Sequence, residues 1–153
     1  MQYRKISNVE VSLLGMGNMR LPVIEGQPES AIDYAKAQAI IDYAYAHGIN
    51  YYDTAYRYHG GESENFIGQA LKKYPRDTWY LASKFPGHMC EHIGNGVLHF
   101  TAGLAGRPDS TVDGVFNEQL RKCQVDYFVF YLLHNVNEKS IAMYLDEEVG
   151  IVP

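Results

Sequence analysis

The sequence predicts an α/β fold built on a parallel sheet, equivalent to about the first four β/α units of a (β/α)8 barrel, a partial TIM barrel. Strand and helix patterns alternate along the chain, and this alternation implies parallel strands joined by right-handed crossovers. Asp53, Lys84 and His134 each end an otherwise apolar run. In a barrel, the C-terminal ends of the strands share one rim, which carries the catalytic residues.

A short β-hairpin is expected before the first β/α unit. Residues 1–12 alternate polar and apolar side chains on either side of a Ser-Asn turn. Residues 13–17, LLGMG, follow as a short buried strand that stops at Gly15 and Gly17.

The first two helices enclose a strand. Residues 35–48 carry alanine, isoleucine and tyrosine at helical spacing and end at Gly48, a residue typical of helix C-caps. Residues 49–53, INYYD, are the next strand. Residues 63–71 place their apolar side chains on one helical face, with two glutamates near the positive N-terminal end of the helix.

The second half of the chain continues the pattern. Residues 79–85, WYLASKF, predict a strand, and residues 111–123 group apolar side chains at three-to-four spacing, as a helix does. Residues 126–134, DYFVFYLLH, are apolar after the aspartate, which predicts a strand buried on both faces. Residues 140–150 predict a last, weaker helix.

Two parallel architectures fit this order, an open doubly wound sheet and a barrel. The glycines of LLGMGNM do not form a dinucleotide-binding G-x-G-x-x-G, because Leu21 and Pro22 follow Arg20 and no helix opens there. The polar residues at three successive strand ends favour the barrel.

Composition narrows the range of functions. A net charge of -5 and a pI near 5.6 argue against nucleic-acid binding and favour small-molecule ligands. No apolar run approaches the ~20 residues that span a bilayer, so we expect a protein that does not enter a membrane. The N-terminus lacks the apolar core of a signal peptide, so we expect the protein to be cytoplasmic. Cys90 and Cys123 are expected to be free thiols. We expect residues 1–153 to form a single domain.

Four motifs carry a family resemblance. DTAYRYHGGESENFIGQAL, LASKF, DYFVFYLLH and LLGMGNMRLP resemble, in this order and on these elements, segments of the aldo-keto reductases. The resemblance covers residues 1–86 and 111–148. It implies an NAD(P)H-dependent oxidoreductase that reduces an aldehyde or ketone to an alcohol.

The resemblance also implies a catalytic set. Tyr58, five residues after Asp53, is the expected proton donor to the carbonyl oxygen. Lys84 makes the phenol a better acid, Asp53 keeps the lysine charged and aimed, and His134 orients the carbonyl or assists proton transfer. Tyr56 is the alternative acid. Read singly, each residue could instead be structural: a packed tyrosine, a solvated lysine or a core histidine.

The cofactor implied by the resemblance is NADPH or NADH, contacted by Gly17, Asn18, Met19 and Asp53. Asn18 departs from the threonine or cysteine that is usual in relatives. Val129 departs from an acidic residue that is common in the fourth strand.

Residues 87–110 form a long loop without a predicted element. It is rich in glycine and holds His88, Cys90, His92 and His99. The H-x-C-x-H spacing raises the alternative of a metal site, but two-residue spacing is unusual for structural zinc, so we assign no metal ligands. At the catalytic end of a barrel such a loop is expected to be a substrate lid.

The chain is about half the length of a complete barrel. Its first and fourth strands are then expected to be unpaired edges, which implies self-association or pairing with a missing C-terminal half. An alternative function follows: a truncated, catalytically silent half-barrel that acts as a fragment or interaction module.

Overall fold

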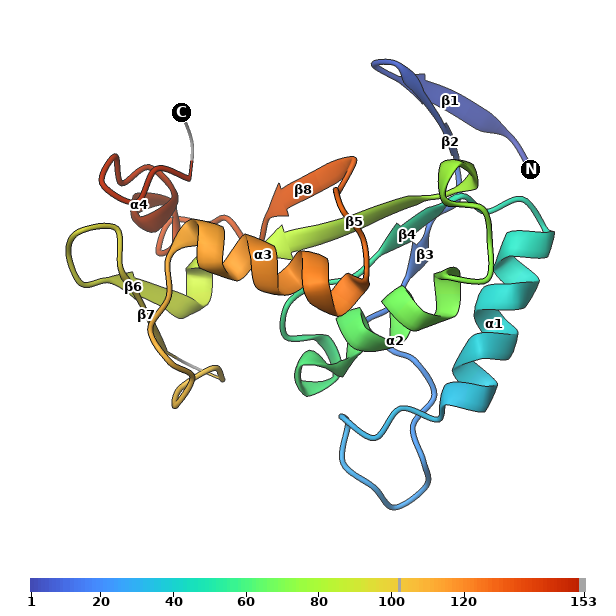
Figure 1. Cartoon of the computed structure of the whole chain (residues 1–153), viewed down its shortest axis with the longest axis horizontal. Helices are drawn as coiled ribbons and strands as arrows, with labels where there is room; N and C mark the ends of the chain where they lie inside the picture. The colour runs from blue at the N-terminus through green and yellow to red at the C-terminus, as the bar shows by residue number, and fades with distance from the viewer. Residues whose placement is uncertain (102, 152–153) are drawn as a thin grey trace.

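The computed structural model of the protein describes residues 1–101 and 103–151. A parallel sheet lies at its centre, in the order β3-β4-β5-β8. Figure 1 shows three helices side by side along one face of this sheet. The strands are β3 (Met16–Gly17), β4 (Tyr51–Asp53), β5 (Tyr80–Phe85) and β8 (Phe130–Leu133), and the helices are α1 (Tyr34–Ala46), α2 (Glu62–Leu71) and α3 (Val112–Cys123). The predicted parallel α/β architecture is confirmed, and the described sheet is open, with β3 and β8 at its edges.

Two antiparallel hairpins lie outside the sheet. The predicted N-terminal hairpin, β1 (Tyr3–Ile6) with β2 (Val9–Ser12), is present and is bound to the start of β4 by the side chain of Asn50. The second hairpin, β6 (Cys90–His92) with β7 (Leu98–Phe100), lies within the segment predicted to be a loop. The loop prediction is wrong here, because Leu98 and Phe100 bury their side chains in a core.

The last predicted helix is shorter than expected. Helix α4 (Ile141–Tyr144) ends after a single turn, and turns follow it. Short 3₁₀ segments complete the structure: η1 (Tyr58–Gly61), η2 (Arg76–Thr78) and η3 (Gly87–Met89). No helix within residues 1–101 or 103–151 has the length and hydrophobicity to cross a bilayer.

Helix α1 ends at the predicted glycine, and a side chain that was not predicted caps its start. The Asp33 carboxylate accepts a hydrogen bond from the backbone N–H of Lys36 and so caps the N-terminus. Gly48 adopts a left-handed conformation, with φ of 85°. The N–H of Gly48 then reaches Tyr45 O and that of Ile49 reaches Ala44 O, the two bonds of a Schellman motif.

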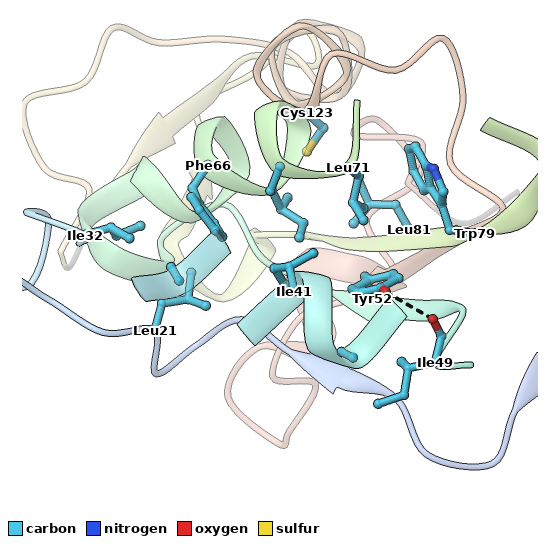
Figure 2. Close-up of a cluster of buried hydrophobic side chains, with 14 residues drawn as sticks. Leu21, Ile32, Ile41, Ile49, Tyr52, Phe66, Leu71, Trp79, Leu81 and Cys123 are labelled. Carbon is cyan, nitrogen blue, oxygen red and sulfur yellow. Dashed lines mark hydrogen bonds between the residues drawn. The ribbon is translucent and has the colours of Figure 1, made fainter. Parts of the chain in front are cut away.

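The larger of two hydrophobic cores fills the space between the helices and the sheet (Figure 2). Ile41 of α1, Phe66 of α2 and Leu81 of β5 are at most 1% exposed there. Tyr52 of β4 is fully buried, and its hydroxyl donates a hydrogen bond to Ile49 O. Helix α2 also approaches α3 closely, because Gly68 lies against the backbone of Cys123.

The edge strands are less buried than predicted. The continuous apolar run 126–134 suggested a strand covered on both faces, but Leu132 and Leu133 are 39% and 37% exposed. The prediction was wrong because the helices α1, α2 and α3 cover one face of the described sheet (Figure 1) and leave these side chains at the end of β8 partly open to solvent. Similarly, only Met16–Gly17 of the predicted strand 13–17 pairs with β4, and Leu13 and Leu14 are exposed.

Candidate active site

The C-terminal ends of three parallel strands bring the predicted catalytic residues together. Asp53 is the last residue of β4, Lys84 lies near the end of β5, and His134 follows β8 directly. The strand register places Ala82 beside Asp53, so Lys84 projects one further step along the same face. Tyr58 reaches this rim from the turn that follows β4.

Lys84 is the centre of the arrangement. Its Nζ donates to Asp53 Oδ1 at 2.6 Å and to the backbone carbonyl of Thr54 at 2.7 Å. The same nitrogen lies 3.4 Å from the Tyr58 hydroxyl oxygen and 4.8 Å from the centre of its ring. The Lys84 side chain is 14% exposed and that of Asp53 27%, so the ion pair is shielded from much of the solvent screening that weakens surface pairs.

His59 holds the turn that presents Tyr58. His59 itself has a φ of 54°, and Gly60 and Gly61 also have positive φ, which lets the chain reverse tightly. The buried imidazole accepts a hydrogen bond from the N–H of Leu21 at Nε2 and donates from Nδ1 to Glu29 O. Sequence reasoning missed this residue, since a histidine next to a catalytic turn carries no pattern of its own.

His134 lies beside Tyr58, with ring centroids 5.8 Å apart in an edge-to-face arrangement. On its other side the His88 ring lies 4.7 Å away. Burial, followed by the charges of His88 and Lys84, lowers the pKa of His134 to about 4. His134 is therefore neutral near pH 7.

A pocket of about 590 Å³ opens in front of these side chains. Tyr58 and His134 line it together with Met19 from the end of β3 and His88 from η3. The described part of the segment 87–110 contributes Met89 and Gly103 as well. The segment predicted to be a substrate lid thus forms part of the pocket wall.

A buried polar cluster supports Lys84 from behind. The Glu64 carboxylate is fully buried, where it accepts hydrogen bonds from Ser83 at 2.7 Å, Gln119 at 2.6 Å and Lys122 at 2.9 Å. Gln119 also donates to the carbonyl oxygen of Lys84 at 3.2 Å. From the sequence, Glu64 was expected only as a charge near the N-terminal end of a helix, and this contact was missed.

The three predicted cofactor-binding residues at the end of β3 lie at the same rim. Gly17 is exposed, and a Cβ at this position would have no atom within 4 Å. Asn18 is buried; its Nδ2 donates to Asp53 O at 2.9 Å, and its Oδ1 has no hydrogen-bond partner within the described structure. Met19 is 45% exposed.

Tyr56, the alternative acid, lies away from the rim. It is fully buried, and its hydroxyl donates to the Glu118 carboxylate at 2.6 Å. Burial, reinforced by Glu118, raises the pKa of this phenol well above its usual range. The structure therefore leaves Tyr58 as the tyrosine next to Lys84.

The histidines and cysteine of the segment 87–110 do not converge. Cys90 is buried with its thiol on Pro86 O, and burial raises its pKa to about 12. His92 pairs with Asp146 and His99 with Asp109. In the described parts of the chain, no group of three or more potential metal ligands occurs. Cys90 and Cys123 are both free, as predicted.

Comparison with known proteins places this arrangement in a family. The sequence pattern of the Aldo/keto reductase family matches residues 13–148. The chain belongs to this family. It is 30% identical to a probable aldo-keto reductase 1 of Glycine max over 92% of this chain and 37% of that protein. It is 32% identical to the protein tas of Escherichia coli over 88% of this chain and 38% of that protein.

Solved structures of aldo-keto reductases share the fold. The holo form of an enzyme from Bacillus halodurans superposes with a TM-score of 0.64 at 29% identity, over 97% of this chain and 47% of that one. An aldo/keto reductase from Klebsiella pneumoniae, solved in complex with NADP and acetate, gives a TM-score of 0.52 at 27% identity. This chain thus spans between about a third and a half of the length of these relatives.

Proposed function

We propose that this chain provides the proton-donating rim of an NADPH- or NADH-dependent oxidoreductase that reduces an aldehyde or ketone to an alcohol. The observation that carries the proposal is the position of the Lys84 ammonium, 2.6 Å from Asp53 Oδ1 and 3.4 Å from the Tyr58 hydroxyl, at the wall of a pocket. Family membership supports the same reaction class.

Each residue of the rim has its own role in proton transfer to the carbonyl oxygen. As negative charge develops on the carbonyl oxygen, the Tyr58 hydroxyl transfers its proton to that oxygen, and the Lys84 ammonium stabilises the phenolate that remains. Asp53 keeps Lys84 charged and, together with Thr54 O, fixes its direction. Neutral His134 offers a hydrogen bond that orients the carbonyl group.

The residues at the end of β3 fit the amide end of a nicotinamide. Gly17 leaves open space at the sheet edge, and Asn18 Oδ1 is an acceptor that no described group uses. Met19 lines the pocket. When bound, a reduced nicotinamide supplies the hydride that adds to the carbonyl carbon. We propose that Gly17, Asn18, Met19 and Asp53 hold this end of the cofactor.

Cofactor binding and turnover test the proposal on the whole chain. NADPH fluorescence is titrated first, and oxidation of NADPH by an aldehyde is then followed. We expect Tyr58→Phe to retain cofactor binding and to reduce turnover by a factor on the order of 10²–10⁴, because the variant lacks the proton. Tyr127→Phe, at an exposed tyrosine that precedes β8 and so lies at the end of the strands opposite the rim, is the matched control. Equal turnover in Tyr58→Phe and wild type would refute the assignment.

A second candidate function rests on the open edges of the sheet. Strands β3 and β8 each have one partner in the described structure, and unpaired parallel edges favour pairing with another chain. In this alternative the chain is a catalytically silent interaction module that associates with itself or with a complementary C-terminal half. Absence of NADPH binding at millimolar cofactor, about 4 kcal/mol of binding free energy, would favour the module over the enzyme.

A further inference from the structure

The pocket in front of Tyr58 contains a cation that the proton-transfer scheme does not use. Arg57 precedes Tyr58 in the chain, is exposed, and lines the same pocket. Within residues 1–101 and 103–151 its guanidinium forms neither a salt bridge nor a side-chain hydrogen bond. In contrast, Arg107 pairs with Glu118, and Arg76 donates to two backbone carbonyls. No side-chain or backbone acceptor of the described structure therefore occupies the guanidinium donors of Arg57.

One part of the guanidinium packs against Gly103. Gly103 lies so close that a Cβ there would be 2.6 Å from Arg57 Nε and 2.7 Å from Cζ. Gly103 has a φ of 72° and belongs to the segment that forms the pocket wall. Because the backbone packs directly against it, Arg57 loses less side-chain freedom on binding a ligand than a fully solvated arginine would.

The lining of the same pocket includes a second polar atom without a hydrogen bond in the described structure. His88 Nδ1 is buried and makes no hydrogen bond within the described structure. Burial is the main cause that lowers the pKa of His88, and the positive charge of Arg57 contributes to it. Arg57 and His88 both line the pocket, and the His88 ring centroid lies 4.7 Å from that of His134.

The other residues that line the pocket carry little charge. Met19, Pro28, Ser30, Met89 and Asn135 carry no charge, and His134 is neutral near pH 7. Glu29 is the one acid among the described lining residues, and it lies beyond salt-bridge distance of Arg57. A guanidinium with free, planar donors matches a carboxylate better than any neutral group.

We propose that the preferred substrates are aldehydes or ketones that carry a carboxylate, and that Arg57 binds this carboxylate while the carbonyl group faces Tyr58. The inference rests on the proposed function for the reaction at the carbonyl group. It assigns Arg57 to substrate specificity rather than to proton transfer, and it assigns His88 as the neighbouring hydrogen-bonding group of the same subsite.

Binding of a matched pair of probes tests the proposal without a cofactor. 4-Formylbenzoate and 4-formylbenzamide have nearly the same shape and differ in charge. Each is titrated into the ¹⁵N-labelled chain near neutral pH, and amide shifts report the Kd. We expect the carboxylate to bind about fivefold to tenfold more tightly than the amide, the size of a partly exposed charge-assisted contact.

The variants make the expectation specific to the site. Arg57→Gln should bring the ratio of the two Kd values close to one, whereas Arg57→Lys, which keeps the charge but loses the planar fork, should give an intermediate ratio. Glu29→Gln should increase the ratio. Arg4→Gln, on the hairpin at the opposite end of the strands, changes the net charge equally and should leave the ratio as in wild type.

The outcomes separate this inference from the proposed function. A wild-type ratio near one, or a preference for the carboxylate that survives in Arg57→Gln, would overturn the assignment. If the ratio depends on Arg57 but neither probe is reduced in the presence of NADPH, the carboxylate subsite stands and the proposed function fails. If both probes are reduced with equal efficiency and bind equally, the function stands and the subsite does not.

Discussion

Replacing Gly68 by alanine would place a methyl group inside the backbone of α3. An ideal Cβ at this position lies 2.4 Å from both C and O of Cys123 and 2.8 Å from its Cα. No rotation of a side chain can relieve contacts with backbone atoms, so the two helices must separate. Overpacking of this kind costs about 3 kcal/mol. Removal of a helix glycine returns about 1 kcal/mol, and we expect a net loss of about 2 kcal/mol in the free energy of unfolding.

Gly114→Ala is the matched control in the neighbouring helix. A Cβ at residue 114 would lie 2.4 Å from Ser110 Oγ, the end of a short side chain that can rotate, and 3.3 Å from Thr111 Oγ1. The helix-propensity gain of up to about 1 kcal/mol is then largely retained. The same substitution should therefore be destabilising at position 68 and neutral to stabilising at position 114.

Urea unfolding followed by far-UV circular dichroism measures both effects. The midpoint should fall for Gly68→Ala with an unchanged m-value, and it should stay or rise for Gly114→Ala. If the two variants shifted the midpoint in the same direction, or if Gly68→Ala were as stable as wild type, the close approach of α2 and α3 would be refuted.

Three further predictions concern the site and the sheet. Burial lowers the pKa of His134 to about 4, so on acidification from pH 6.5 to 4 the unfolded chain takes up a proton that the folded chain does not. The free energy of unfolding should therefore fall by about 1–2 kcal/mol as the pH is lowered over this interval, after allowance for partial exposure. Urea unfolding at a series of pH values should show a smaller fall for His134→Gln than for wild type. Lys122→Met removes the ammonium from the fully buried Glu64 carboxylate and should cost about 3–5 kcal/mol, against less than about 0.5 kcal/mol for the exposed Lys72→Met; equal losses in a thermal melt would contradict the buried pair. The unpaired β8 edge predicts concentration-dependent association in light scattering after size exclusion, weakened by Leu132→Lys, and a monodisperse monomer at all concentrations would count against it.

The local sequence was sufficient for most of the strands and helices and for the residues at the rim. Gly48 indicated the end of α1, and apolar runs indicated β4 and β5. Parallel strands present their C-terminal ends on the same side, so Asp53 and Lys84 could be placed together before any coordinates were known. The structure adds that the two side chains are 2.6 Å apart and that Tyr58 reaches them.

Other features depend on contacts between distant parts of the chain. His59 is fixed by Leu21 and Glu29, and the Glu64 carboxylate by residues of β5 and α3. No local pattern encodes such partners. The β6-β7 hairpin was missed for the same reason, since a segment rich in glycine and histidine becomes ordered only because two of its side chains reach a core formed by other elements.

For this protein the sequence by itself determined the alternation of strands and helices, the parallel sheet and the residues at the strand ends, because periodicity and capping are local. Only the tertiary structure decided which of two nearby tyrosines faces Lys84, that the last side chains of β8 are exposed, and that Arg57 lines the pocket with no ion-pair partner among the described residues. Burial and pairing depend on what the rest of the chain brings to a residue, and the sequence around that residue does not record it.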